Sequence, residues 1–201
     1  MYAGILKRAI DFTLALLGIV ALSPVLLFLS LLVGCTSRGP VLFRQRRVGR
    51  LKREFMILKF RTMYTCAPKD MPTHLLQDPA AFITPVGRFL RRTSLDELPQ
   101  LFNILAGQMA VVGPRPALWN QYDLIAARDA CGANALRPGL TGLAQVSGRD
   151  ELPVAEKARL DGVYARRVTF LGDVKIFLRT FSRVARADGF REGAEDSARK
   201  R

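Results

Sequence analysis

The sequence has few of the residues that soluble catalytic and metal centres most often use. Its 201 residues include a single histidine, His74, and three widely separated cysteines, Cys35, Cys66 and Cys131. One histidine argues against a Ser-His-Asp triad and against a histidine-based zinc site. An odd number of cysteines without a C-x-x-C pair supports neither a disulfide framework nor a zinc knuckle, and a reducing cytosolic compartment is the default expectation.

Acidic residues are also scarce. The chain carries 17 Asp and Glu against 31 Lys and Arg, a formal net charge of +14, although 49% of its residues are hydrophobic. A basic protein seated on an anionic membrane and handling phosphorylated substrates accounts for both properties. A nucleic-acid binder would account for the charge alone, and the sequence lacks basic residues interleaved with aromatic ones. We therefore expect no nucleic-acid partner. A membrane-surface scaffold would also suit the composition, but it would leave the motifs described below without a role.

One long apolar run lies near the N-terminus, from Ile10 to Val33, and its length suits a membrane span. Pro24 lies in its middle, where it removes a backbone hydrogen bond and bends a helix, and Ser23 can satisfy a freed group. Both flanks are basic, with Lys7 and Arg8 before the run and several arginines after it. The positive-inside rule then places both ends in the cytoplasm. We predict a re-entrant membrane helix over residues 1–36, broken at Ser23-Pro24.

A lipoprotein signal is the alternative for the same stretch, because Leu32-Val33-Gly34-Cys35 resembles a lipoprotein cleavage box. An apolar run of about 24 residues with a central proline is longer than the usual hydrophobic region of a signal peptide. The arginines after Cys35 also suit the cytoplasmic side. We therefore expect a cytosolic catalytic domain over residues 37–188 and a flexible polar tail over 189–201.

The remaining patterns predict an α+β fold that is mostly helical, with short strands and surface amphipathic helices. We expect a strand at 41–43 followed by a basic loop, a strand or short helix at 54–62, a helix opened by Thr84-Pro85, helices at 118–130, 156–167 and 173–187, and loop and strand at 137–149. The last helix has an apolar stripe and several arginines. It suits the bilayer surface and packing on the core equally well.

The stretch Ser94-Leu95-Asp96-Glu97-Leu98-Pro99-Gln100 places two adjacent carboxylates at an expected helix start. Ser94 and Glu97 fit a capping box, whereas a start at Asp96 avoids placing Pro99 in the second turn. Consecutive helical residues do not face each other, so the pair cannot flank a glycosidic bond as a glycosidase requires. It can still bind one metal ion or bracket one phosphate.

Several motifs together resemble the monotopic phosphoglycosyl transferases, the bacterial sugar transferase group. They are the Lys7-Arg8 start, Ser23-Pro24, LKFRTM (58–63), RRTSLDELPQLFNIL (91–105), VVGPRP (111–116), RPGLTGLAQVSGR (137–149) and the D-x-x-Y of Asp161 and Tyr164. The resemblance covers the chain to about residue 187 and points to the small form, a catalytic domain with one re-entrant helix. Gln108 and Ala110 depart from the usual Asp and Ser, Ser147 from a common Asn and Val163 from a common aromatic residue, which leaves the sugar preference open.

The resemblance implies transfer of a phospho-sugar from a nucleoside diphosphate sugar, by family habit a UDP-sugar, to polyprenol phosphate. This would be the first membrane step of glycoconjugate assembly, at the cytoplasmic face of the bacterial inner membrane, with a homodimer as a possible assembly. Asp96 would be the nucleophile and Mg²⁺ the cofactor, held by Asp96 and Glu97; whether Glu97 is a metal ligand or a base stays open. The phosphate and nucleotide candidates are Lys59, Arg88, Arg115, Arg137 and Arg149. We expect Asp161 to be a structural partner of one of these arginines, and Tyr164 to pack in the core.

Overall fold

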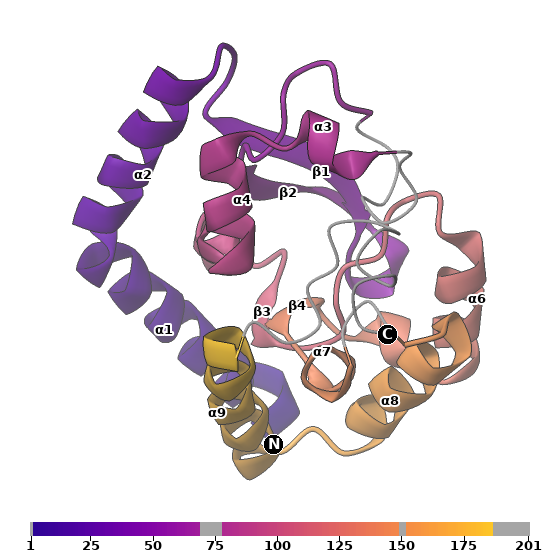
Figure 1. The fold of residues 1–201 in the computed structure, drawn as a ribbon. Helices are drawn as coiled ribbons and strands as arrows, with labels where there is room; N and C mark the ends of the chain where they lie inside the picture. Colours follow the sequence, from indigo (N-terminus) through magenta and orange to yellow (C-terminus); the bar gives the residue numbers. More distant parts are fainter. Residues whose placement is uncertain (1, 69–77, 149–151, 187–201) are drawn as a thin grey trace.

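The computed structural model describes residues 2–68, 78–148 and 152–186 (Figure 1), so His74, Arg149 and the tail at 189–201 lie outside the described residues. The N-terminal half contains η1 (Tyr2–Leu6), α1 (Lys7–Ala21), α2 (Ser23–Thr36), β1 (Leu42–Val48), η2 (Arg50–Lys52), β2 (Glu54–Phe60), α3 (Pro79–Phe82), α4 (Pro85–Arg92) and η4 (Leu95–Glu97). The C-terminal half contains α5 (Gln100–Leu105), β3 (Ala110–Val112), α6 (Tyr122–Ala130), η5 (Ala133–Ala135), β4 (Gly139–Thr141), α7 (Leu143–Ser147), α8 (Val154–Arg166) and α9 (Phe170–Arg186). A mostly helical chain with a few short strands is the expected α+β class.

The apolar run forms two helices that meet at the predicted break. Tyr2–Ala21 and Ser23–Thr36 are bent by 64° to each other and line one edge of the molecule (Figure 1). Within the described residues, no single helix is long and apolar enough to cross a bilayer, and only this bent pair meets those criteria together. Pro24 lacks the N–H that would bond to the Val20 carbonyl, and the Ser23 hydroxyl donates to that oxygen instead, at 2.8 Å.

The two helices are attached to the rest of the chain by different forces. On α1, the buried Asp11 accepts a hydrogen bond from the Val111 N–H at 3.0 Å, and the Lys7 ammonium lies 2.7 Å from the Asp173 carboxylate. On α2, Leu29 and Val33 pack against Phe60 and Leu90 in an apolar cluster. The polar residues of α1 therefore fix its position on β3 and on α9, whereas α2 is attached mainly by apolar packing, with one long hydrogen bond from Arg61 to the Val33 carbonyl at 3.4 Å.

The antiparallel hairpin of β1 and β2 corrects the prediction of a basic loop after Phe43. Leu42 pairs with Phe60 and Val48 with Glu54, so the basic residues are part of the strand. Arg44 and Arg46 are exposed while Gln45 is buried and Arg47 half-buried, a period of two that polar inward residues conceal in the sequence. The stretch after Glu54 is a strand, which resolves the alternative of a short helix.

The parallel pair β3 and β4 brings VVGPRP against the glycine-rich segment, with Ala110 opposite Gly139 and Val112 opposite Thr141. A Cβ atom on Gly113 or Gly139 would collide with the backbone of the facing strand, so the crossing requires glycine at both positions. The prediction of loop and strand here missed α7. Five residues are too few to show a helical period.

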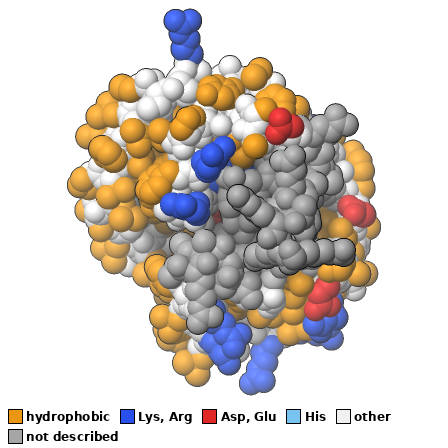
Figure 2. Space-filling model, in the orientation of Figure 1, with side chains coloured by type: hydrophobic (Ala, Val, Ile, Leu, Met, Phe, Trp, Pro, Cys, Tyr) orange, Lys and Arg blue, Asp and Glu red, His pale blue; other side chains and the backbone are white. Residues whose placement is uncertain are grey.

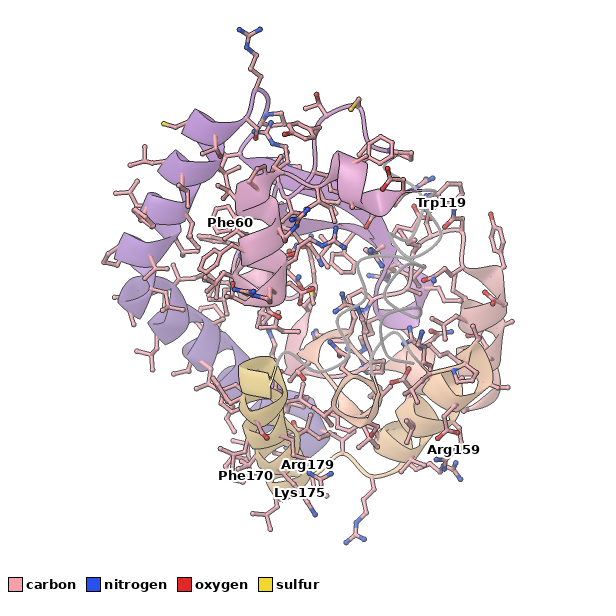
Figure 3. All side chains as sticks on the ribbon, in the orientation of Figure 1. Phe60, Trp119, Arg159, Phe170, Lys175 and Arg179 are labelled. Carbon is pink, nitrogen blue, oxygen red and sulfur yellow. The ribbon has the colours of Figure 1, made fainter. Side chains whose placement is uncertain are left out.

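The helices of the C-terminal half confirm most of the expected elements. α6 begins at Tyr122 rather than at Leu118, and α8 lies where a helix was predicted. On α9, Asp173 and Ile176 are buried in the domain, while six apolar side chains stay exposed: Phe170, Leu171, Val174, Phe177, Leu178 and Phe181. Lys175 and Arg179 project from the same helix (Figure 3). The helix therefore packs on the core and also presents an apolar face.

The exposed apolar side chains are concentrated on the N-terminal helices and on α9. On α1 and α2 they include Phe12, Leu17, Val20, Leu27, Phe28 and Leu31. Figure 2 shows hydrophobic side chains along the edge that α1 and α2 form. A patch of this kind is typical of a surface that contacts a membrane or another protein.

Candidate active site

The two adjacent carboxylates lie in a tight turn before α5. Leu95–Glu97 forms one 3₁₀ turn, Ser94 has a left-handed backbone with φ of 57°, and α5 begins only at Gln100 with Pro99 at its N-cap. Ser94 makes no capping hydrogen bond to a helix N–H, so the capping-box interpretation is wrong, and a helix start at Asp96 is also wrong. Glu97 is thereby available for tertiary contacts.

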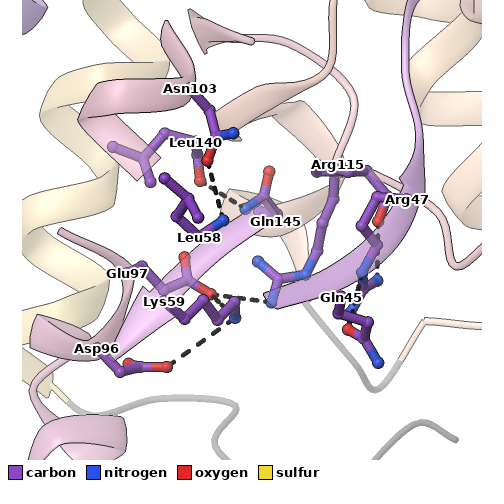
Figure 4. Close-up of polar contacts among 11 residues, drawn as sticks. Gln45, Arg47, Leu58, Lys59, Asp96, Glu97, Asn103, Arg115, Leu140 and Gln145 are labelled. Atoms are coloured by element: carbon purple, nitrogen blue, oxygen red, sulfur yellow. Dashed lines mark hydrogen bonds and ion pairs between the residues drawn. The ribbon is translucent and has the colours of Figure 1, made fainter. Parts of the chain in front are cut away.

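Glu97 is held by two cations from distant strands (Figure 4). Its Oε1 atom accepts from the Lys59 ammonium at 2.7 Å and from the Arg115 guanidinium at 3.1 Å. The same ammonium lies 3.9 Å from Oδ2 of Asp96, which is an ion pair but too long for a hydrogen bond. Lys59 is on β2 and Arg115 is in the turn after β3. Four of the residues named from the sequence therefore meet at one site.

The two carboxylates differ in their electrostatic surroundings. Burial raises the pKa of Asp96 to about 6, an effect that the charge of Glu97 reinforces and that Lys59, Arg91 and Arg115 only partly offset. Burial also acts on Glu97, but the charges and hydrogen bonds of Lys59 and Arg115 outweigh it and lower the pKa of that carboxyl. Glu97 is a compensated anion at neutral pH, whereas Asp96 is a buried carboxylate to which no cation among the described residues is hydrogen-bonded. Such an anion is a better nucleophile than a fully paired one.

The turn that presents Arg115 is fixed from both sides by arginines that the sequence did not single out. Arg128 donates to the Arg115 carbonyl at 2.9 Å, and Arg47 donates to the Pro116 carbonyl at 3.0 Å. Arg128 is itself paired with Asp161, at 2.6 and 2.8 Å, with both side chains buried. Asp161 is a structural partner of an arginine, as expected, but its partner Arg128 was not among the candidates.

Asn103 fixes α5 against β2 beside the site. Its Oδ1 accepts from the Leu58 N–H at 2.9 Å, and its Nδ2 donates to the Met56 carbonyl at 2.9 Å and to Oε1 of Gln108 at 2.7 Å. These bonds set the register between the helix that follows Asp96 and the strand that carries Lys59 (Figure 4). Asn103 is buried mid-helix, where its sequence position gave no sign of this contact.

Arg137 lies apart from this group of contacts, and the structure does not assign Arg88 or Arg149 to it. Arg137 donates to the Gly107 carbonyl at 3.0 Å, beyond the opposite end of α5, so it is not placed beside Asp96. Arg88 is exposed on α4, the helix before the site, and its role stays a prediction. Arg149 lies outside the described residues. Tyr164 is buried in the core, as expected, and donates to Asp173 at 2.7 Å.

The carboxylate oxygens of Asp96 and Glu97 suit a hard cation that is bound jointly by the protein and a substrate. Among the described residues there is no group of three or more His, Cys, Asp or Glu that could enclose a metal ion. The two carboxylates can supply oxygen ligands, and Mg²⁺ commonly takes one or two carboxylates together with water and substrate phosphates. Since Lys59 and Arg115 occupy Oε1 of Glu97, the remaining oxygens are its Oε2 and those of Asp96. The residues present therefore fit a shared Mg²⁺ but not an all-protein cage.

Comparison with known proteins gives a consistent set of relatives. The model of the family described as bacterial sugar transferase matches residues 2–187. The chain is 36% identical to the exopolysaccharide production protein ExoY of Sinorhizobium fredii, over 92% of this chain and 88% of that protein. It is 42% identical to the UDP-glucose:undecaprenyl-phosphate glucose-1-phosphate transferase of Escherichia coli, over 88% of this chain and 40% of the relative. It is 35% identical to the undecaprenyl-phosphate galactose phosphotransferase of Salmonella typhimurium, over 92% of this chain and 41% of that protein. The chain thus spans less than half the length of the last two.

Proposed function

The chain belongs to the bacterial sugar transferase family, and on that premise we propose that it transfers a sugar 1-phosphate from a nucleotide sugar to a polyprenol phosphate. Relatives named as undecaprenyl-phosphate sugar phosphotransferases support this assignment. The observation that carries it is the buried Asp96 beside the Lys59–Glu97–Arg115 group, an anion with two cations nearby to receive phosphate charge. A UDP-sugar is the proposed donor.

In the first step, an oxygen of Asp96 attacks the phosphorus that bears the sugar. A new bond forms between the carboxylate oxygen and phosphorus, and the bond to the nucleotide breaks. The nucleoside monophosphate leaves with that electron pair. Lys59 lies 3.9 Å from the carboxylate of Asp96, and Lys59 and Arg115 both pair with Glu97. In this proposal the two cations offset the charge that grows on the phosphate oxygens.

In the second step, a phosphate oxygen of polyprenol phosphate attacks the aspartyl phospho-sugar. The aspartyl oxygen–phosphorus bond breaks, the carboxylate of Asp96 is restored, and the product is a polyprenyl diphospho-sugar. Because the nucleophile is regenerated, the two half-reactions use one site in turn. Glu97 keeps the two cations in place throughout, and it is also the proposed second oxygen donor to the metal.

Mg²⁺ is the proposed cofactor, and when bound it would neutralise charge on the diphosphate of the donor. Asp96 and Glu97 are the residues that would hold it. A carboxylate nucleophile beside a metal-bound phosphate would need no histidine. The proposal therefore agrees with the scarcity of histidine in the sequence.

The test is a covalent adduct. Incubation of the protein with UDP-sugar and Mg²⁺, without polyprenol phosphate, should release UMP once and add the mass of a sugar phosphate to Asp96, as read by peptide mass spectrometry. Asp96→Asn should abolish both adduct and turnover, whereas Asp123→Asn, a change on the exposed side of α6, should alter neither. An Asp96→Asn protein with near-normal turnover would contradict the assignment.

We also propose that the bent pair of α1 and α2 enters the bilayer and returns to the cytoplasmic face, because the bend and the apolar surface suit it. Cysteine labelling at position 3 with an impermeant reagent in intact cells tests this placement, in a background with the native cysteines replaced. The site should be shielded in the native sequence and partly labelled after Pro24→Ala, which restores the missing helix bond. Labelling of the native sequence from outside would indicate a true span.

A further inference from the structure

A second polar site lies away from Asp96. A cavity of about 650 Å³ opens between the start of α1, the segment that follows α6 and β3. Its lining includes Lys7, Arg8, Arg50 and Arg137, but none of Lys59, Asp96, Glu97 and Arg115. The cavity is therefore separate from the proposed transfer site, and nothing in the proposed reaction uses it.

Three guanidinium groups meet at this cavity, and none of them forms an ion pair with a carboxylate of the described residues. Arg8 donates to the Ile104 and Leu105 carbonyls at 2.6 and 3.0 Å. The Nε atoms of Arg50 and Arg137 donate to the Ala135 and Gly107 carbonyls at 3.1 and 3.0 Å. Within the described part of the chain, no ion pair joins these three arginines to an acid.

The nearby acids are already committed to other groups. Asp11 is the acidic residue on the cavity wall, and it accepts from the Val111 N–H and lies 3.6 Å from the Lys7 ammonium. Asp173 takes the same ammonium at 2.7 Å. Lys7 is thus neutralised, and Asp11 only partly offsets the charge of the three arginines, which keep a surplus of positive charge.

Capping of α5 explains only part of this arrangement. Arg8 binds the last carbonyls of the helix and Arg137 binds the carbonyl beyond them, which is favourable for cations at a helix C-terminus. Arg50 takes no part in that cap. Burial lowers the pKa of Arg137, and the positive charges of Arg50 and Arg8 lower it further. The positive charges of the cluster therefore repel one another. The terminal nitrogens of Arg50 and Arg137 make no hydrogen bond within the described residues. Guanidinium groups bind phosphate through such N–H donors.

The other side of the cavity is apolar and continues into the exposed surface of α1. Ile5 and Phe12 line the cavity, and they are 89% and 41% exposed. The same helix carries the apolar face described above. A ligand with both a phosphate and a hydrocarbon part matches both walls, and a bilayer supplies such a ligand beside an apolar helix.

We propose that this cavity binds the phosphate of an anionic membrane lipid, through Arg50 and Arg137 at its cationic wall and with the lipid chain along Ile5 and Phe12. The lipid is distinct from the polyprenol phosphate acceptor of the transfer site. It would hold the start of α1 and the end of α5 at the depth of the lipid headgroups.

Native mass spectrometry of the full chain in detergent tests the proposal with two lipids, dioleoyl phosphatidylglycerol and dioleoyl phosphatidylcholine. The wild type should retain one phosphatidylglycerol in preference to phosphatidylcholine. Arg50→Gln/Arg137→Gln should weaken that binding about tenfold or more, since each change removes a charge-assisted contact. The matched control is Arg53→Gln/Arg159→Gln, which removes the same charge from exposed positions outside the cavity and should bind as the wild type does.

Two further measurements test whether the donors of Arg137 matter beyond its charge and whether each variant is folded. Arg137→Lys keeps the charge but loses the fork of donors, and it should bind more weakly than wild type and more tightly than the double variant. Circular dichroism reports whether each variant is folded, and Arg50→Gln alone leaves the α5 cap intact. Equal binding of both lipids, or equal loss in the control, would overturn the proposal. Displacement of the lipid by millimolar inorganic phosphate would overturn the lipid as the source and leave a soluble phosphate compound instead.

Discussion

The two ends of α5 have opposite electrostatic arrangements. Before its first residue lie the buried Asp96 and the half-buried Glu97, with Lys59 and Arg115 close to them. Beyond its last residue lie Arg8 and Arg137, with Arg50 nearby and no acid paired to them in the described residues. The first end contains a nearly balanced set of charges, and the second contains a surplus of positive charge.

This difference suits the two proposals, transfer chemistry at the first end and lipid attachment at the second. At the first end, the nearby cations compensate Glu97 fully and Asp96 only in part, which suits Glu97 to positioning the cations and Asp96 to the proposed role of nucleophile. At the second end, the guanidinium groups bind carbonyls with part of their donors and leave the rest for an anion. The following predictions test each arrangement, beginning with the largest expected effect and ending with the smallest.

Asp161→Asn should cause the largest loss of stability, because it leaves Arg128 buried without its counter-charge below the Arg115 turn. We expect a loss of about 3–5 kcal/mol, as for other broken buried ion pairs. Thermal unfolding followed by circular dichroism measures it. Glu156→Gln on the same helix breaks an exposed pair with Arg159 and should change the melting temperature little, because solvent screens that pair. Equal losses in the two variants would show that burial of the first pair is unimportant.

Glu97→Gln should lower turnover about 100-fold, which corresponds to about 2.7 kcal/mol of transition-state stabilisation. The amide keeps the shape of the side chain but loses the charge that holds Lys59 and Arg115. Initial rates with varied donor measure the effect on kcat and on KM. Glu54→Gln, on an exposed residue of β2 that pairs with Arg46 at 3.4 Å, is the control and should keep normal rates. A Glu97→Gln enzyme with unchanged kcat would remove Glu97 from the active site.

Asp96→Asn should stabilise the metal-free fold at high pH. The pKa of Asp96 is about 6 in the fold against an ordinary 3.8, so folding favours its protonated form. That contribution is present below about pH 4 and is lost as the pH rises through 6, whereas asparagine stays neutral. The variant should therefore gain up to about 3 kcal/mol at pH 8 and almost nothing at pH 4. Unfolding in a chelating buffer measures this gain, and a pH-independent difference would contradict it.

Added Mg²⁺ should stabilise the wild type more than Asp96→Asn, which is the reverse of the difference expected in a chelating buffer. If Asp96 and Glu97 hold the ion, added Mg²⁺ should raise the melting temperature of the wild type, because a ligand that binds only the folded state stabilises it. Tenfold over the dissociation constant gives about 1.4 kcal/mol, and Asp96→Asn should show much less. Ca²⁺ and Na⁺ at matched ionic strength are the controls, and equal shifts in both proteins would place the ion elsewhere.

Arg8→Lys should have the smallest effect, at the cationic end of α5. A lysine keeps the charge but cannot donate to the Ile104 and Leu105 carbonyls at once, so the loss should be about 1 kcal/mol of stability. Thermal unfolding checks it, with Arg53→Lys as an exposed control. A loss as large as that of Asp161→Asn would show that the cap, and not the buried pair, dominates the stability of this region.

Several features could be predicted from the sequence because they depend on local chemistry. Pro24 removes a backbone hydrogen bond from any helix that would continue through it, so the break was predictable without a structure. Thr84 caps α4 through the Gly87 N–H, as its position before a proline indicated. The basic part of β1 was missed because Gln45 and Arg47 face inward, which hides the alternation on which strand prediction depends.

The sequence by itself determined the broken apolar segment, the adjacent carboxylates and the family, since each is written in consecutive residues. Only the tertiary structure decided which cations serve them. Lys59 and Arg115 are 38 and 18 residues from Glu97, and Arg137 has motif support equal to theirs, yet it lies at the other end of α5. A motif fixes the type of residue at a position, but the strand pairings and the bonds of Asn103 and Arg128 fix where its side chain lies. Charge interactions fall with distance through space, and spacing along the chain does not set that distance.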